Sequence, residues 1–233
     1  MANSSWIDVT AADGGKFGAY LSLPPTGKGP GIVLIQEIFG INPHIRGVAD
    51  QYASDGYVVL APDLFWRMKP RVELGYGETD FKQAFDYMGK MDFAKAMQDI
   101  GTSIAALRAL PGCGAKVASL GYCMGGLLSF LTAAQGTVDA AVCYYGGGIG
   151  GKLDEAPKIK CPTLFHFAAN DKFIPTAEIE AVRKTFAGRD NTRVDVYPGV
   201  DHGFNCWDRG TYDQRSAALA RGRSLAFLAT TIS

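Results

Sequence analysis

The stretch Gly121-Tyr-Cys-Met-Gly-Gly126 is the most informative part of the sequence. It follows the run Lys116-Val-Ala-Ser-Leu120, which is typical of a buried strand, and precedes an apolar run over 127–134, which is typical of a helix. Glycines on either side of Cys123 allow a tight turn, and the N-terminus of the following helix favours a thiolate or an oxyanion. We therefore predict a nucleophile elbow with Cys123 at its tip.

Strands and helices alternate along the rest of the chain. One helix is expected from about Asp92 to Leu110, where apolar residues recur at spacings of three and four. Another follows Pro175 with Thr176 as its cap, and the last spans about 212–229. The predicted strands are 30–35, 57–61, 116–120, 140–144, 162–167 and 193–197. This order predicts an α/β fold with a mostly parallel central sheet, helices on both faces, and ligands beyond the carboxyl ends of the strands.

The charge balance argues against nucleic acid and membrane surfaces as partners. Lys plus Arg and Asp plus Glu number 23 each, which leaves no positive excess. The first residues, Met1 to Asp8, lack a basic segment followed by an apolar core, and no stretch approaches the roughly 20 apolar residues that a bilayer span needs. We expect a cytoplasmic monomer that binds neither nucleic acid nor membranes.

The cysteines suggest neither a disulfide framework nor a metal site. Their number is odd and no Cys-x-x-Cys occurs, so at least one thiol is expected to be free for chemistry. His202 and Cys206 are four residues apart, but Gly203 and Asn205 lie between them and no further ligand pair is near, so we predict no metal. Structural roles are expected for Cys113, Cys143 and Cys161.

A cysteine nucleophile needs a base, and the sequence holds three histidines. His166 lies inside an apolar strand and is expected to be part of the core. His44 follows Pro43 at the start of a predicted helix, where an exposed or capping role is expected. His202 lies in the loop Gly199-Val-Asp-His-Gly203 after a late strand, which makes it the predicted base.

A carboxylate is needed to orient the imidazole. Asp171 follows the strand over 162–167 and precedes the helix after Pro175. Asp201 is the alternative acid, but a direct neighbour in sequence usually points elsewhere. With Asp171 the chain order is nucleophile, acid, histidine, which is the order of α/β-hydrolases. We therefore predict a triad of Cys123, His202 and Asp171.

Six short stretches, in the same order along the chain, resemble the dienelactone hydrolase family, also called carboxymethylenebutenolidases. The resemblance runs over nearly the whole length. It implies a single-domain α/β-hydrolase fold over residues 1–233 that cleaves a carboxylic ester or lactone through a covalent acyl-enzyme, without cofactor or metal. The stretches are Gln36-Glu-Ile-Phe-Gly40, Ala61-Pro-Asp63, Gly121-Tyr-Cys-Met-Gly-Gly126, Tyr144-Tyr-Gly146, Asn170-Asp171 and Asp201-His-Gly-Phe204.

The resemblance also gives a role to Glu37. Its carboxylate is expected near the resting thiol, which it keeps uncharged until substrate moves the acid and frees a thiolate to pair with His202. The residues alone indicate only that a Glu ending a buried strand is costly without a partner and is therefore a functional candidate. The oxyanion hole is expected to use the backbone N–H groups of Met124 and Ile38.

Two departures from the family bear on the substrate. Members that cleave dienelactone are expected to carry arginines at the positions of Phe81 and Cys206, where they would hold the free carboxylate of the substrate. Lys82 or Arg209 could substitute, although an ammonium lacks the bidentate fork of an arginine. We expect a less acidic or more apolar ester or lactone, bound by Phe39, Phe81, Phe85, Tyr145 and Phe204.

Three other interpretations remain open. Gly146-Gly-Gly-Ile-Gly-Gly-Lys152 formally matches a phosphate-binding loop, but Leu153 replaces the Ser or Thr that would meet magnesium. The fold could serve as a binding module with Cys123 as a redox switch, against which the complete triad and Glu37 weigh. Acyl transfer or thioesterase action would use the same catalytic residues as hydrolysis, so the sequence does not separate them.

Overall fold

The computed structural model describes residues 3–233, which form two compact units that divide after Val117. Each unit combines strands and helices and is described separately, so the expectation of one domain stays a prediction. Met1 and Ala2, the start of the segment examined for a targeting signal, lie outside the described residues. Within residues 3–233, no helix combines the length and the apolar character that a membrane crossing requires.

The first unit contains both antiparallel and parallel strands. β1 (Asn3–Thr10) pairs with β2 (Lys16–Leu23), and β2 pairs with β4 (Val58–Pro62), both antiparallel. β3 (Gly29–Ile35) then pairs with β4 in parallel. β3 and β4 confirm the predicted strands at 30–35 and 57–61. β1 and β2 were not predicted, because their exposed and buried positions are interspersed and leave no continuous apolar run.

Three helices accompany these strands. α1 (Pro43–Ser54) begins after Asn42, whose side chain accepts a hydrogen bond from the Ile45 N–H at 3.1 Å. α3 (Phe93–Ala109) confirms the predicted helix over 92–110 and is capped by Asp92. α2 (Glu78–Lys90) was not predicted: Ala84 is its single buried residue, so no apolar stripe marks it in the sequence.

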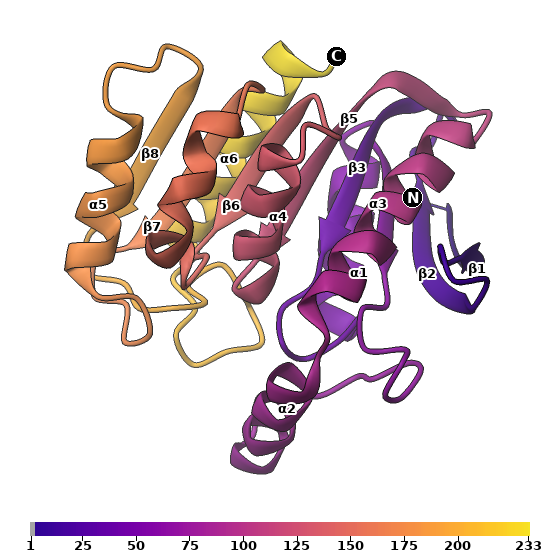
Figure 1. Ribbon diagram of the computed structural model, residues 1–233, viewed down its shortest axis with the longest axis horizontal. Coiled ribbons are helices and arrows are strands. Elements are labelled where there is room, and N and C mark those ends of the chain that lie inside the picture. The colour runs from indigo at the N-terminus through magenta and orange to yellow at the C-terminus, as the bar shows by residue number, and fades with distance from the viewer. Residues whose placement is uncertain (1–2) are drawn as a thin grey trace. The chain divides into compact units, whose positions relative to one another are not determined.

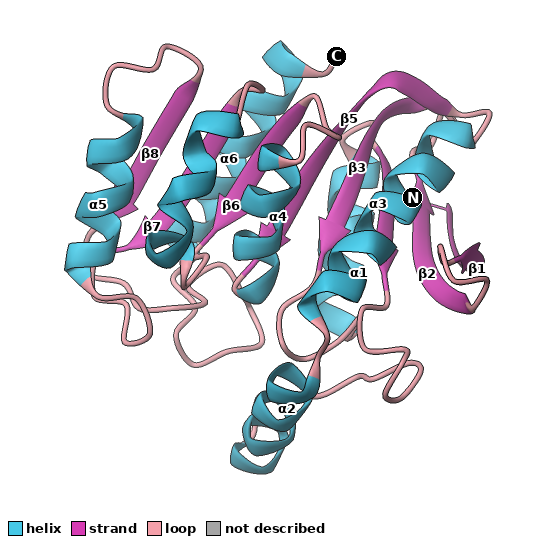
Figure 2. Cartoon of the chain, in the orientation of Figure 1, coloured by secondary structure: helices cyan, strands magenta, loops and turns pink. Residues whose placement is uncertain are grey.

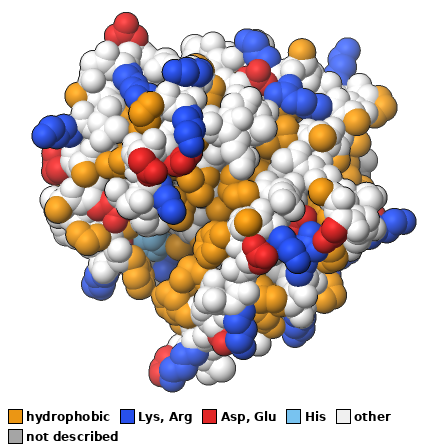
Figure 3. Space-filling model, in the orientation of Figure 1, with side chains coloured by type: hydrophobic (Ala, Val, Ile, Leu, Met, Phe, Trp, Pro, Cys, Tyr) orange, Lys and Arg blue, Asp and Glu red, His pale blue; other side chains and the backbone are white. Residues whose placement is uncertain are grey.

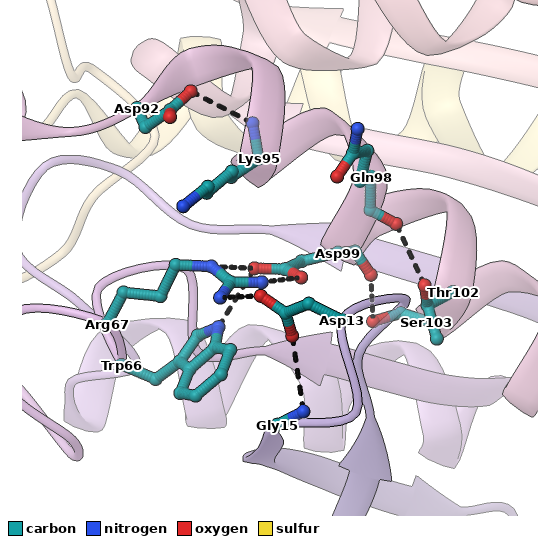
Figure 4. A network of polar contacts seen from close by, with 10 residues as sticks. All are labelled: Asp13, Gly15, Trp66, Arg67, Asp92, Lys95, Gln98, Asp99, Thr102 and Ser103. Carbon is teal, nitrogen blue, oxygen red and sulfur yellow. Dashed lines mark hydrogen bonds and ion pairs between the residues drawn. The ribbon is translucent and has the colours of Figure 1, made fainter.

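A buried ion pair ties α3 to the segment that follows β4 (Figure 4). The Asp99 carboxylate, on α3, accepts hydrogen bonds from Trp66 Nε1 at 2.8 Å and from Arg67 Nη2 at 2.9 Å. Arg67 also pairs with Asp13 at 2.6 Å, so its guanidinium lies between two carboxylates. Because Asp99 is only 1% exposed, these donors satisfy a charge that would otherwise be costly to bury.

The second unit is a parallel arrangement of strands. β5 (Cys113–Tyr122) begins in the first unit and pairs with β6 (Ala140–Tyr144), followed by β7 (Thr163–Ala168) and β8 (Thr192–Tyr197). These strands confirm the four predicted over this part of the chain. In Figure 2, the arrowheads of β6 and β7 point toward the edge at which the long loops of the unit lie. The loops after β7 and β8 therefore share one edge, as the carboxyl ends of parallel strands must.

Helices cover both faces of these strands. In Figure 1, α4 (Met124–Ala134) and α5 (Thr176–Phe186) lie in front of β6 to β8, and α6 (Gln214–Thr231) lies behind. The prediction of Thr176 as the cap of α5 was wrong. Pro175 is the N-cap residue, in extended conformation and without a side-chain hydrogen bond, and Thr176 is the first helical residue.

Candidate active site

Cys123 lies in a strained turn between β5 and α4. Its backbone angles, φ 56° and ψ −119°, fall in a region that side-chain-bearing residues rarely adopt. Backbone hydrogen bonds hold the turn, from the Cys123 N–H to Tyr144 O at 3.0 Å and from the Gly126 N–H to Cys123 O at 2.9 Å. The structure therefore gives Cys123 the geometry that the elbow motif predicted.

The glycines around Cys123 are required by close backbone contacts. A Cβ added at Gly121 would lie 1.9 Å from the carbonyl oxygen of Gly125, and one at Gly126 would lie 2.5 Å from that of Tyr144. Real Cβ atoms do not approach other atoms so closely. The spacing of glycines in the motif thus follows from the packing of the turn against β6 and against its own helix.

The loop after β7 brings a carboxylate to the imidazole of His202. His202 Nδ1 lies 2.9 Å from Asp171 Oδ2 and 3.1 Å from Oδ1, and neither side chain has more than 4% of its surface exposed. Asp171 Oδ1 also accepts hydrogen bonds from the N–H groups of Phe173 at 2.9 Å and Ile174 at 3.0 Å. The carboxylate is therefore fixed by its own loop as well as by the ring.

Asp201, the alternative acid, contacts other groups. Its carboxylate accepts hydrogen bonds from the backbone N–H of His202 at 2.7 Å and of Lys172 at 3.0 Å, and it pairs with the Lys172 ammonium at 2.9 Å. These contacts link the loop of Asp171 to the loop of His202. The Nδ1 atom of the His202 ring is hydrogen-bonded to Asp171, whereas Asp201 is hydrogen-bonded to the backbone N–H of His202.

The charge state of His202 reflects both neighbours. Burial by itself lowers the pKa of the imidazole, but the negative charge of Cys123 and hydrogen bonds with Asp171 and Cys123 outweigh burial and raise the pKa to about 10. A thiolate at Cys123 and a carboxylate at Asp171 therefore favour the protonated form of the ring. The second unit thus contains a nucleophile candidate and a carboxylate, each in contact with an imidazole whose pKa is raised.

The other cysteines and histidines have different surroundings. None of the five cysteines forms a disulfide in the described residues. Burial raises the pKa of the thiols of Cys113, Cys143 and Cys161, which makes them weaker nucleophiles. His166 is fully buried in β7, as expected of a core residue. The expectation for His44 was wrong: it is also fully buried, because α1 turns this side inward and Asn42 provides the cap instead.

Two aromatic rings contact the imidazole of His202. The ring centroids of Tyr145 and Phe173 lie 4.9 Å and 5.1 Å from that of His202. Tyr145 has a φ of 35° and is fully buried, as is Phe204, whose ring lies 5.5 Å from that of Tyr145. Both were predicted to bind substrate, and that role stays a prediction. Tyr145 packs against the His202 ring, and Phe204 packs against Tyr145.

In the first unit, Glu37, Ile38 and Phe39 lie in the loop between β3 and α1. Glu37 is fully buried, and its Oε2 accepts a hydrogen bond from the Tyr76 hydroxyl at 3.1 Å. The same hydroxyl accepts one from Asn42 Nδ2 at 3.1 Å. Sequence reasoning missed Tyr76, because it lies in an irregular segment 39 residues away in sequence from its partner.

Aromatic side chains extend from this loop to α2. The ring centroid of Phe39 lies 4.6 Å from that of Tyr76 and 4.9 Å from that of Phe81, and the centroid of Phe81 lies 6.4 Å from that of Phe85. Phe39 is 1% exposed, whereas Phe85 is 43% exposed. Of the predicted substrate-binding residues in this unit, Phe81 and Phe85 are therefore the two that are partly exposed to solvent.

Comparison with known proteins decides the family. The profile of the dienelactone hydrolase family matches residues 17–232. The chain belongs to this family. It is similar to carboxymethylenebutenolidase 1 of Cupriavidus pinatubonensis, 35% identical over 228 residues and 97% of either chain. It is also similar to the carboxymethylenebutenolidase of Pseudomonas putida, 35% identical over 96% of this chain and 95% of that one.

A solved structure supports the same assignment. A candidate dienelactone hydrolase from Klebsiella pneumoniae superposes with a TM-score of 0.87 at 29% identity, over 98% of this chain and 99% of that one. The predictions of an α/β-hydrolase fold and of a carboxymethylenebutenolidase-like hydrolase are therefore confirmed.

Lys82 and Arg209, the two residues that could replace the expected arginines of this dienelactone hydrolase homologue, differ in their surroundings. Lys82 lies on α2 with its side chain 76% exposed and paired with Glu78 at 2.7 Å. Arg209 is only 9% exposed, and its Nη1 lies 2.3 Å from where a Cβ on Gly203 would be, beside His202. Cys206, at one of the expected arginine positions, is fully buried. Of the two cations, Arg209 is the one next to a candidate catalytic residue.

The glycine-rich segment 146–151 binds the side-chain carboxylate of Glu178, on α5. The backbone N–H groups of Gly148 and Gly150 donate to Glu178 Oε1 at 2.8 Å and 3.1 Å. In a phosphate-binding loop, backbone N–H groups donate hydrogen bonds to a phosphate in the same manner. Because the carboxylate of α5 accepts from them, this segment is explained without a nucleotide.

Proposed function

We propose that the protein hydrolyses a carboxylic ester or lactone through an acyl-enzyme on Cys123. The contact of His202 with both Asp171 and Cys123, expressed in its pKa of about 10, carries this proposal. Such a pKa fits a thiolate and an imidazolium side by side, the state in which a cysteine attacks and a histidine can donate a proton.

The acylation half begins with attack of the Cys123 thiolate on the carbonyl carbon. A C–S bond forms, and the carbonyl electron pair moves to oxygen. The tetrahedral intermediate then collapses, the C–O bond to the alcohol breaks, and the leaving oxygen takes a proton from His202 Nε2. Asp171 holds Nδ1 through this step, so that Nε2 is the nitrogen available to the substrate.

Hydrolysis of the acyl-enzyme returns the enzyme to its starting state. His202, now neutral, removes a proton from water, and the hydroxide adds to the acyl carbon. The C–S bond breaks, and the thiolate and the carboxylic acid are released. The oxyanion of both intermediates would accept a hydrogen bond from the N–H group of Met124, the first residue of α4, and a second donor at Ile38 stays a prediction from the sequence.

Glu37 is proposed to restrain the thiol before substrate binds. The resemblance of the stretch from Gln36 to Gly40 implies that this carboxylate disfavours a negative charge on the thiol and so protects the cysteine from oxidation. In this proposal the Tyr76 hydroxyl holds Glu37 in its resting position. Substrate would displace the carboxylate and allow the thiolate to form.

The proposed substrate is a neutral or weakly acidic ester or lactone. The phenylalanine at 81 and the cysteine at 206 offer no positive charge for a free carboxylate, and Phe81 packs against Phe39 in an apolar cluster. A true dienelactone hydrolase is the second candidate, and the buried guanidinium of Arg209 beside Gly203 is the observation in its favour.

Two measurements test the proposal. Intact-protein mass spectrometry after mixing with an aryl acetate should show an acetyl adduct that is lost in C123A and retained in C161A, a cysteine outside the site.

Comparison of neutral esters with dienelactone should show higher kcat/KM for the neutral esters. F81R should narrow that gap by about 1.5–3 kcal/mol, the range for a hydrogen bond to a charged group. Equal rates on dienelactone and the best neutral ester would favour the second candidate.

A further inference from the structure

Exposed apolar side chains of the second unit gather on the two loops that carry Asp171 and His202. Phe173 is 54% exposed, Trp207 38% and Tyr212 40%, and all three lie in these loops; Leu219, on α6, is the remaining large exposed hydrophobic residue of residues 118–233. Figure 3 shows hydrophobic side chains beside the pale-blue histidine surface. Of the three histidines, His202 alone has any exposed surface, at 4%.

Phe173 is fixed close to the acid and the base. Its backbone N–H donates to Asp171 Oδ1 at 2.9 Å, and its ring meets that of His202 edge to face, at 5.1 Å between centroids and 74° between planes. Tyr145 contacts the same imidazole but is fully buried. Phe173 is therefore a neighbour of the imidazole that offers apolar surface to a bound molecule.

The proton path indicates which part of a substrate reaches this surface. Because Nδ1 is bonded to Asp171, Nε2 must meet the alcohol oxygen of the ester within hydrogen-bond distance. The group attached to that oxygen then lies beside the imidazole, whereas the acyl group lies toward the nucleophile. A ring packed against the imidazole thus borders the alcohol part of the substrate.

We infer that Phe173 determines specificity for the alcohol part of the substrate and favours an aromatic group over a small aliphatic one. An aromatic alcohol can pack edge to face or offset against the exposed ring, a geometry that favours aromatic pairs beyond simple burial. This inference rests on the proposed function, since it assigns the leaving-group side of the same site.

The test compares phenyl acetate with ethyl acetate in F173A, F173L and L219A. Both esters form the same acetyl-enzyme, and their difference in leaving-group reactivity is the same in every variant. The change in the ratio of their kcat/KM values between variants therefore reports recognition of the alcohol. The ratio should fall about tenfold in F173A, mainly through KM for phenyl acetate, and less in F173L. L219A, which removes an exposed apolar side chain on α6, should leave the ratio unchanged.

An equal loss for both esters would overturn the inference, because it would mean that Phe173 acts only by holding His202. No loss for either ester in F173A would overturn it as well. Binding of phenol to C123A and to C123A/F173A, measured by calorimetry, gives a readout without turnover. Weaker binding in the double variant supports the inference even if the proposed nucleophile fails, and equal binding contradicts it.

Discussion

His166 and His202 lie in the same unit and are both buried, but their ring pKa values move in opposite directions. His166 is enclosed by neutral hydroxyls, with Tyr197 and Ser224 each 2.9 Å from a ring nitrogen. Burial, with a contribution from the charges of Arg223 and Arg193, lowers its pKa to about 3. His202 has a pKa of about 10, because Cys123 and Asp171 outweigh burial.

The difference shows that burial does not distinguish a catalytic histidine from a structural one. Both rings lose most of their contact with water, and both have their nitrogens engaged. What separates them is the charge of the partner: a hydroxyl leaves the neutral ring favoured, whereas a carboxylate and a thiolate favour the protonated ring. The predictions below test that distinction, from the largest expected effect to the smallest.

Replacing His202 should have the largest effect on catalysis. H202Q removes the proton donor and acceptor of the proposed mechanism, and we expect kcat to fall by about 10⁴-fold or more, as for members of other catalytic triads. The measurement is steady-state hydrolysis of an aryl acetate. An H202Q enzyme with nearly full turnover would remove His202 from the mechanism.

The two aspartates near His202 should differ strongly. D171N should lower kcat by about 10³ to 10⁴-fold, because an amide sets the wrong tautomer of the ring. D201N should cost far less, because Asp201 contacts the backbone and Lys172. Parallel kinetics on both variants decide the matter, and the reverse ranking would transfer the role of orienting acid to Asp201.

Replacing His166 should affect stability more than catalysis. H166L leaves the buried hydroxyls of Tyr197 and Ser224 without their shared partner, and we expect the free energy of unfolding to fall by about 2–4 kcal/mol. Urea unfolding measures the loss, with S224A as a milder control. A kcat for H166L as low as that of H202Q would show that the hydroxyl-enclosed histidine also serves catalysis.

The pH dependence of stability should separate the two histidines. The folded pKa of His166 is about 3, below its ordinary value of 6.5, so its contribution is complete above pH 6.5 and is lost as the pH falls from 6.5 toward 3. The folded pKa of His202 is raised to about 10, so its contribution is complete below pH 6.5 and is lost as the pH rises toward 10.

Unfolding free energies across this range test these signs. H166L should flatten the acid side of the profile, and H202Q should flatten the alkaline side. Each single group contributes a slope of at most about 1.4 kcal/mol per pH unit. Variants that flatten the opposite sides would show that the partners of the two rings have been misjudged.

Much of this site was predictable because its parts are local. The elbow is specified by glycines within six residues, and the chain order of Cys123, Asp171 and His202 follows from strands that end at one edge. The sequence left Asp201 as an alternative to Asp171 for the orienting acid, since the choice depends on side-chain direction within two loops.

The contacts that sequence reasoning missed are long-range or lack an apolar pattern. The hydrogen bond from Tyr76 to Glu37 joins an irregular segment to a strand end, and no spacing rule connects them. The burial of His44 depends on which side of α1 faces the core. Phe173 resembles any loop residue until the fold brings it against His202.

The backbone of Cys123 has a consequence for how this protein could evolve. At φ 56° a side chain is disfavoured, and glycine would adopt the same turn with less strain. The fold alone would therefore prefer glycine where the chemistry needs a thiol. Selection for heat resistance without selection for activity should drift toward glycine at this position, and a glycine there in a natural homologue would indicate a descendant that has stopped being an enzyme.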